Sequence, residues 1–295
     1  MGTITFVVPT VPSGVGLNRA QAPESYMYLG ITEQLFRPQG DELVGPWLAT
    51  DWQIAPDFSQ ATITIRSGVQ FHKGWGEMTA EDFAWNMNDT NAKTNPTSIA
   101  GMAGDYAALF GEAKATGPYT IEVPFAQFDV TWTANQMNQE SISFAVFSKK
   151  ACDQNGLDWC RENIIGTGPF EVREWIKDDR IVLDAVQSHW DKVPQIKTLR
   201  YVAVPEATSR VAMLQTGEAD MARVVIKDIR DLRTKGFKTA DAHAVRQVPI
   251  NYAGNFWEEK HALTGEPLNV TLDLTKPWIG DPKDPARMES ARKVR

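Results

Sequence analysis

The 295-residue sequence has little of what several classes of protein need. It holds two cysteines and four histidines, and 37 acidic residues outnumber 30 basic ones, which gives a formal net charge of −7. This charge argues against binding to nucleic acid or to anionic lipid, because both require a basic surface. No apolar run approaches the roughly 18 residues of a membrane-spanning helix. The first residues, TITFVVPTVP after Met1-Gly2, have no basic leader and no cleavage site of a signal peptide.

Motifs of common enzymes are also missing. The sequence has no GxSxG nucleophile elbow, no GxGxxG turn and no phosphate-binding lysine loop. The acidic pairs Glu81-Asp82, Asp178-Asp179 and Glu258-Glu259 are adjacent, so their side chains diverge in regular structure and do not converge on one bond. The histidines are scattered. We therefore expect no catalytic residues, no metal site and no cofactor.

Cys152 and Cys160 lie in the segment KKACDQNGLDWCREN. Eight residues of one straight helix span about 12 Å, whereas the Cα atoms of a disulfide lie within roughly 7 Å. A disulfide therefore requires a turn, for which Asn155-Gly156 is suited. We expect this bridge, and with it an oxidising compartment; the alternative is two unrelated small apolar residues.

The remaining sequence alternates strand and helix patterns. β-Branched or alternating runs predict strands, and helical spacing, capping residues and terminal glycines predict helices. The predicted strands are 3–9, 52–55, 61–66 and 119–125, and the predicted helices are 25–36, one that begins after Thr79 with Asp82 completing a capping box, 207–214 ending at Gly217, and 228–235 ending at Gly236. Trp52, Trp85, Trp175 and Trp190 are assigned to the core. These patterns indicate an α/β protein.

Three ordered groups of motifs resemble a known family. The first comprises LATDW at 48–52, IRSGVQFHKG at 65–74 and TAEDF at 79–83. The second comprises GTGPF at 166–170 and SHWDKVP at 188–194, and the third is LQTGEAD at 214–220. Together they resemble the family 5 extracellular solute-binding proteins of ABC transporters, the receptors for dipeptides, oligopeptides and nickel. Asp51, Ile65 and His189 depart from the usual Ser, Leu and Tyr.

The resemblance implies a lobe like that of a type II periplasmic binding protein, with an additional small α+β subdomain. It divides the chain into 1–36, the first part of lobe one; 37–150, the inserted subdomain; 151–246, the continuation of lobe one; and 247–295, the crossover and the start of a second lobe. The second lobe is then largely missing, and the sequence is expected to be an N-terminal fragment that binds its ligand weakly and could dimerise.

The function implied is that of a non-catalytic receptor, periplasmic or extracellular, that delivers short peptides to the permease subunits of an ABC importer. A removed N-terminal signal could have tethered it to the membrane. An oligosaccharide is the second ligand considered, and a nickel complex the third. A secreted hydrolase is the alternative from another class, and an interaction domain without a small ligand is a further one.

Two segments match the positions where the family borders its ligand. The loop-to-helix junction offers Glu24, Ser25 and Tyr26, and the crossover offers Tyr252, Asn255 and Trp257. An aromatic ring supplies contact area at low entropic cost, and an amide both donates and accepts hydrogen bonds. The family's histidine at position 72 is taken as structural, which disfavours nickel bound by histidine.

Overall fold

The computed structural model describes residues 2–12, 30–39, 41–137, 144–240, 260, 265–267, 271, 273–281 and 283–294. The chain forms two compact units, Met1–Gly236 and Phe237–Arg295, which are treated separately below. The four predicted domain ranges stay predictions.

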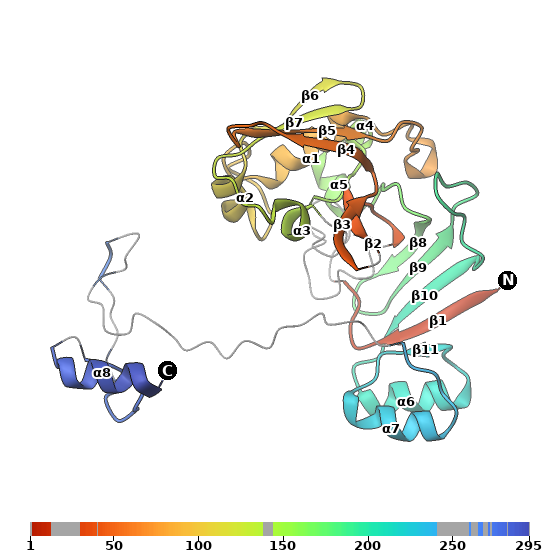
Figure 1. Ribbon diagram of the computed structural model, residues 1–295. Coiled ribbons are helices and arrows are strands. Elements are labelled where there is room, and N and C mark those ends of the chain that lie inside the picture. The colour runs from red at the N-terminus through yellow and green to blue at the C-terminus, as the bar shows by residue number, and fades with distance from the viewer. Residues whose placement is uncertain are drawn as a thin grey trace. The chain divides into compact units, whose positions relative to one another are not determined.

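A five-stranded mixed sheet forms one part of the first unit, in the order β11-β1-β10-β9-β8 (Figure 1). Strand β1 pairs in parallel with β10 and with β11, while β9 runs antiparallel to β10 and β8. The strands are β1 Thr3–Val8, β8 Phe170–Ile176, β9 Arg180–Ala185, β10 Thr198–Ala203 and β11 Met221–Ala222. Helices α6 (Ala207–Thr216) and α7 (Ile226–Thr234) lie beside the β11 end of this sheet. Gly217 ends α6 with a left-handed φ of 79°, as the sequence predicts.

An antiparallel sheet of four strands, in the order β4-β5-β7-β6, and the hairpin β2–β3 form the other part of the first unit. Helix α1 packs on β6 and β7. The strands are β2 Phe36–Gln39, β3 Glu42–Pro46, β4 Ala49–Ile54, β5 Gln60–Ile65, β6 Lys114–Gly117 and β7 Thr120–Pro124, and the helices are α1 Ala80–Thr90, α2 Ala103–Leu109, α3 Trp132–Gln136, α4 Lys149–Asn155 and α5 Leu157–Glu162. The predicted strands at 3–9, 61–66 and 119–125 are confirmed within a residue or so at each end, and the strand predicted at 52–55 is the second half of β4.

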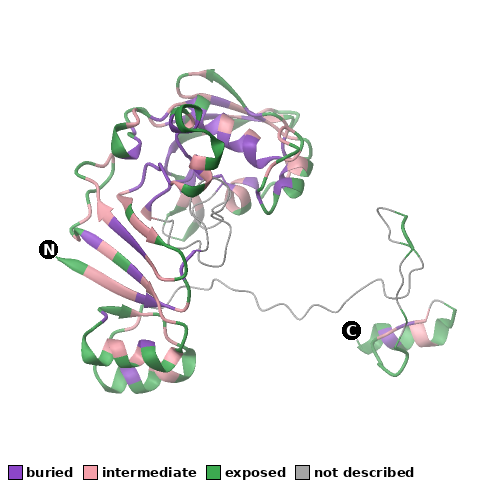
Figure 2. Cartoon of the chain, turned by 180° about the vertical axis from the view of Figure 1, so that it is seen from behind, coloured by how far each residue is buried: buried purple, intermediate pink, exposed green. Residues whose placement is uncertain are grey.

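The first unit has two buried apolar clusters, visible as the purple interiors in Figure 2. One fills the space between the four-stranded sheet and α1 and includes Phe83 and Tyr106, both fully buried. The other lies on the five-stranded sheet and includes Ile181 and both cysteines. The four tryptophans assigned to the core from the sequence are partly buried and pack against one cluster or the other.

Helix α1 begins with the capping box expected from the sequence. The Asp82 carboxylate accepts the backbone N–H of Thr79 at 2.9 Å, and the Thr79 side chain in turn caps the third residue of the helix. The other Asp82 oxygen accepts the backbone N–H of Lys149 at 2.9 Å, at the start of α4. Burial is the largest influence on this carboxyl and raises its pKa. One aspartate thus serves the N-termini of two helices.

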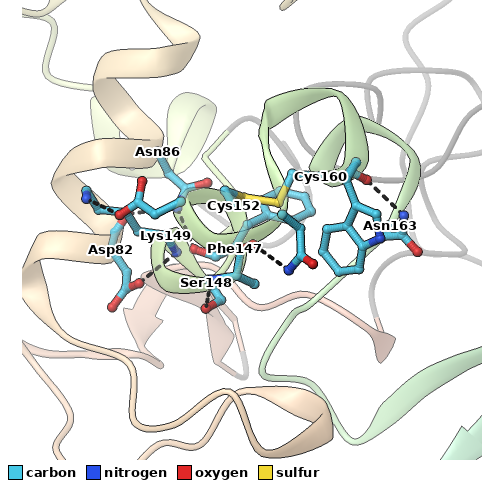
Figure 3. Close-up of a disulfide and its surroundings, with 12 residues drawn as sticks. Asp82, Asn86, Phe147, Ser148, Lys149, Cys152, Cys160 and Asn163 are labelled. Carbon is cyan, nitrogen blue, oxygen red and sulfur yellow. Dashed lines mark hydrogen bonds and ion pairs between the residues drawn. A yellow bond between two sulfur atoms is a disulfide. The ribbon is translucent and has the colours of Figure 1, made fainter.

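The two cysteines join α4 to α5, which meet at Gly156 (Figure 3). Their Cα atoms are 5.5 Å apart, a separation that the turn at Gly156, with φ of 90°, makes possible. Asn86 of α1 donates to the carbonyl of Phe147 at 2.9 Å, directly before this helical hairpin. The bridge therefore closes a hairpin that is held to α1 by hydrogen bonds.

The predicted helix 25–36 is wrong over residues 31–36. Residues 31–35 have no helical structure, and Phe36 opens strand β2. The carbonyl of Leu35 accepts from the N–H groups of Trp47 and Ala49, and the carbonyl of Glu33 accepts from Val146. These carbonyls bond to distant segments instead of to the next turn, so tertiary pairing overrides the local helical spacing. Residues 25–29 lie outside the described residues.

In the second unit, the structure describes one helix, α8 Pro285–Val294. Among all described residues the longest helix has 11 residues, and none is long and apolar enough to cross a bilayer.

Replacing Cys152 and Cys160 together by alanine is expected to lower the free energy of unfolding by about 2–3 kcal/mol, because the unfolded chain regains the entropy of an open loop. Urea unfolding of the double variant measures the change. Unfolding of the unaltered protein after reduction should show a loss of similar size, and mass spectrometry before and after reduction tests the bridge itself. An unchanged unfolding midpoint would contradict a stabilising role.

Candidate ligand-binding edge of the sheet

One edge of the five-stranded sheet is a candidate for ligand binding. Because β10 and β11 both run parallel to β1, the carboxyl ends of all three lie at the same edge. In open α/β sheets, ligands bind outside the carboxyl ends of the strands. Strand β1 leads at this edge through Pro9–Pro12 into residues 13–29, the segment that holds three of the six predicted ligand residues.

All six predicted ligand residues lie outside the described residues. Glu24, Ser25 and Tyr26 fall in 13–29, and Tyr252, Asn255 and Trp257 fall in 241–259. They stay predictions. The structure instead shows how the two ends of segment 13–29 are held.

The entry to this segment is anchored by a tryptophan. The indole N–H of Trp175, in β8, donates to the carbonyl of Pro12 at 3.1 Å. The neighbouring Val11 is 3% exposed and belongs to the apolar cluster on the sheet. A polar contact and an apolar contact thus hold residues 11 and 12, directly before segment 13–29.

The exit is anchored by the GTG turn, residues 166–168, before β8. The N–H of Gly168 donates to the carbonyl of Ile31 at 3.0 Å. A Cβ atom on Gly168 would lie 2.6 Å from the Gly30 oxygen, and one on Gly166 would overlap the carbonyl oxygen of Ile31. Only glycine permits two backbones to approach this closely.

His72 also holds the GTG turn, through its backbone and its ring. Its backbone N–H donates to the carbonyl of Gly166 at 2.9 Å, and its ring Nε2 lies 2.8 Å from the carbonyl oxygen of Gly168. A carbonyl oxygen only accepts, so Nε2 carries the proton of a neutral imidazole. The residue is 4% exposed, and this burial lowers the pKa of His72 to about 4. The structural role expected for this histidine is confirmed.

Arg210 is a residue that the sequence analysis missed. It is 3% exposed on α6, and its guanidinium donates to the carbonyls of Val204 and Pro205, at 2.6 and 2.7 Å, and of Arg223, at 2.7 Å. These carbonyls follow β10 and β11, so one side chain ties two carboxyl ends of the sheet together. Arg210 lies three residues after Ala207 and four before Leu214, on one face of the helix, but no local pattern identifies its carbonyl partners.

A second buried polar contact, also missed, holds the loop 188–194. The carboxylate of Glu33, 1% exposed, accepts the indole N–H of Trp190 at 3.0 Å and lies 3.5 Å from Nε2 of His189. Nδ1 of His189 accepts two backbone N–H groups, from Asp191 and Lys192, which leaves the proton on Nε2, facing the carboxylate.

The acidic residues of the described pairs have structural roles. Asp82 caps two helices, while Asp178 has a left-handed φ of 59° in the turn before β9 and Asp179 pairs with Arg180. Among the described residues, no group of three or more His, Cys, Asp or Glu side chains is placed to hold a metal ion. Glu258 and Glu259 lie outside the described residues.

Comparison with known proteins decides the family. Residues 44–282, more than half of the chain, match the model of the bacterial extracellular solute-binding proteins, family 5. The chain belongs to this family. The resemblance stated from the three motif groups is thereby confirmed.

Relatives of this family 5 protein include the dipeptide-binding protein of Escherichia coli, 29% identical over a 198-residue alignment that covers 62% of this chain and 36% of the relative. Heme-binding protein A of Haemophilus influenzae is 25% identical over a 253-residue alignment that covers 77% of this chain and 45% of the relative. The chain therefore spans less than half the length of these two relatives.

Solved structures show the same fold. The periplasmic binding protein DppA of Helicobacter pylori, in complex with the peptide STSA, has a TM-score of 0.66 at 23% identity, covering 79% of this chain and 49% of its own. MoaA of A. tumefaciens R10, in complex with mannopinic acid, has a TM-score of 0.69 at 20% identity, covering 79% and 48%. The predicted α/β lobe of the type II periplasmic-binding-protein kind is confirmed.

Substituting Gly166 by alanine is expected to lower the free energy of unfolding by about 3 kcal/mol, because the new methyl group meets backbone that cannot rotate away. Gly104→Ala is the matched control, since its Cβ meets nothing within 4 Å and alanine favours helix α2. Chemical unfolding of both variants measures the difference. Equal stability of the two variants would show that the close approach at 166 is not required.

The pH dependence of stability should depend on His72. Its pKa is 6.5 when unfolded and about 4 when folded, so between these values the unfolded state binds more protons and stability falls as the pH falls. The loss attributable to this residue is roughly 3 kcal/mol by pH 4 and is absent above pH 6.5. In His72→Gln an amide can donate to Gly168 but does not titrate. Its unfolding free energy should decline less between pH 6.5 and 4, and parallel curves for the two proteins would refute the assignment.

Proposed function

We propose that this chain is the first lobe, with its inserted subdomain, of a receptor that binds short peptides and delivers them to an ABC importer. The family match over residues 44–282 carries the proposal. It is supported by relatives that are named for dipeptides and oligopeptides, from Escherichia coli and Bacillus subtilis. A solved structure of the same fold holds the dipeptide Met-Leu.

The mechanism is capture without covalent chemistry. In this proposal a second lobe closes over a ligand that rests on the carboxyl edge of the five-stranded sheet, and closure presents a surface to the permease. The anchored segment 13–29 would bring Tyr26 to this edge, with Glu24 and Ser25 beside it. Tyr252, Asn255 and Trp257 would grip the peptide from the crossover. Specificity would come from hydrogen bonds to the peptide backbone and from roomy pockets for its side chains.

The receptor is proposed to act outside the cytoplasm, periplasmic or extracellular, in keeping with the family's description as extracellular. Export by an N-terminal signal that is later removed, with or without a tether, belongs to the same proposal. The protein is not proposed to be an enzyme, because the family consists of solute-binding proteins. An oligosaccharide ligand, a nickel complex and a dimer of this chain stay predictions that the named relatives do not favour.

Titration calorimetry with dipeptides, tripeptides and tetrapeptides tests the ligand class. The protein purified from its own source should bind one of these groups, with the Escherichia coli dipeptide-binding protein as positive control. Residues 1–295 alone should bind at least 100-fold more weakly, since a single lobe cannot remove a peptide from water. Tight, stoichiometric peptide binding by residues 1–295 would contradict the two-lobe mechanism, and binding of maltodextrins or Ni²⁺–histidine in place of peptides would contradict the ligand class.

Variants of the source protein test the residues. Tyr26→Ala and Trp257→Ala should each weaken peptide binding about tenfold, by loss of a ring that covers the ligand. Tyr119→Ala is the control, because this tyrosine bonds Glu77 in the four-stranded subdomain. A loss of affinity in the control equal to that in the other variants would remove both residues from the site.

A further inference from the structure

A row of aromatic rings leads from the core of the first unit to its surface. Phe36, fully buried, lies 5.9 Å from Trp132, measured between ring centroids. Trp132 lies 5.4 Å from Phe125, and Phe125 lies 5.3 Å from Phe128. The last step, 4.8 Å, joins Phe128 to Phe58 at the tip of the β4–β5 hairpin. The row is thus supported from within and ends in solvent.

Phe58 and Phe128 at the outer end of this row, together with Val130 two residues further along the chain, are here called the hairpin-tip patch. Phe58 is 55% exposed and Val130 is 78% exposed. Because Phe128 is packed on the core, the patch is held in a fixed position and does not depend on the hairpin alone.

Phe58 occupies a backbone conformation that disfavours it. Its φ is 58°, in the left-handed region, where glycine and asparagine are accommodated most readily. The turn itself is closed by backbone hydrogen bonds, from Ala55 to Gln60 at 2.9 Å and from Phe58 to Ala55 at 2.8 Å. Neither bond needs a phenylalanine side chain. A bulky ring in this position costs folding energy and leaves more than half of its surface in water.

Two acidic residues flank the patch in the sequence. Asp57 precedes Phe58 and Asp129 lies between Phe128 and Val130, while Glu122, further off, pairs in register with Lys114 of β6. Hydrogen bonds from the Ser59 side chain and backbone lower the pKa of Asp57, and those from the Thr131 backbone and side chain lower the pKa of Asp129. Both carboxylates, next to the patch in sequence, therefore stay ionised well below neutral pH.

We propose that the hairpin-tip patch docks a protein partner that presents lysine or arginine beside an apolar side chain. The ring faces attract a cation as well as an apolar group, and the flanking carboxylates add to the attraction. A second copy of this chain would bring the same two carboxylates against themselves, and an anionic membrane would be repelled. The chemistry thus selects a basic, partly apolar protein surface.

Photo-crosslinking tests this proposal. A benzophenone amino acid replaces Val130 in the protein expressed in its own source cells, and the adduct is identified by mass spectrometry. We expect a protein other than this chain, crosslinked at a peptide that has lysine or arginine within two residues of an apolar residue. The same probe at Ile99, 43% exposed, is the control and should not give this adduct. An adduct with a second copy, with lipid or with an acidic peptide would overturn the proposal, as would the absence of any adduct specific to position 130.

Three substitutions separate docking from folding. Asp57→Asn with Asp129→Asn keeps side-chain oxygens that can accept the bonds from Ser59 and Thr131 but removes two charges, and should reduce the adduct at least fivefold. Phe58→Asn should reduce it similarly while leaving the melting temperature unchanged or raising it by a few degrees, since asparagine adopts this backbone conformation readily. Undiminished crosslinking in the folded variants would overturn the proposal. If the melting temperature of Phe58→Asn falls, Phe58→Gly takes its place and is judged by the same criteria.

Discussion

The contact between the GTG turn and segment 30–32 is the constraint on which the candidate site depends. Gly166 and Gly168 let two backbones meet at a distance that any side chain would prevent, and the N–H of Gly168 bonds the carbonyl of Ile31. The backbone N–H and the ring of His72 form hydrogen bonds to the carbonyls of the same turn. Two of the three motif groups of the sequence therefore meet in space, and together they set where the chain leaves segment 13–29.

Buried polar groups elsewhere in the first unit also hold distant segments of the chain together. Arg210 bonds carbonyls that follow β10 and β11, Glu33 holds the loop that carries Trp190, and Asp82 caps α1 and α4. Removing one partner of such a contact would leave a desolvated polar group unpaired. Each contact therefore allows only conformations that keep its hydrogen bonds. They fix loops and strand ends to one another.

The two proposals concern different parts of the first unit. The carboxyl edge of the five-stranded sheet is where a solute would lie, and the hairpin-tip patch lies beside the four-stranded sheet. The first depends on a parallel arrangement of strands that recurs in ligand-binding α/β folds. The second depends on an exposed aromatic ring whose backbone conformation and acidic surroundings have no evident benefit for folding.

The sequence by itself determined most local structure, because the signals are short-range. The capping box of Thr79 and Asp82, the left-handed end of α6 at Gly217, the turn that lets Cys152 approach Cys160 and the alternation of β5 all depend on residues a few positions apart. The motif groups were also sufficient to place the chain in its family, since their order and spacing carry more information than any one of them.

Only the tertiary structure decided what happens where distant segments compete for the same backbone groups. Residues 31–35 have helical spacing, yet their carbonyls bond to Trp47, Ala49 and Val146, and no local pattern reveals those partners. Arg210 could be recognised as buried only once the carbonyls beyond β10 and β11 were placed around it, and the closeness of Gly166 to Ile31 joins positions more than a hundred residues apart. Long-range hydrogen bonds and backbone approaches outweigh local propensity because an unpaired buried carbonyl or a steric overlap costs more than one turn of helix provides.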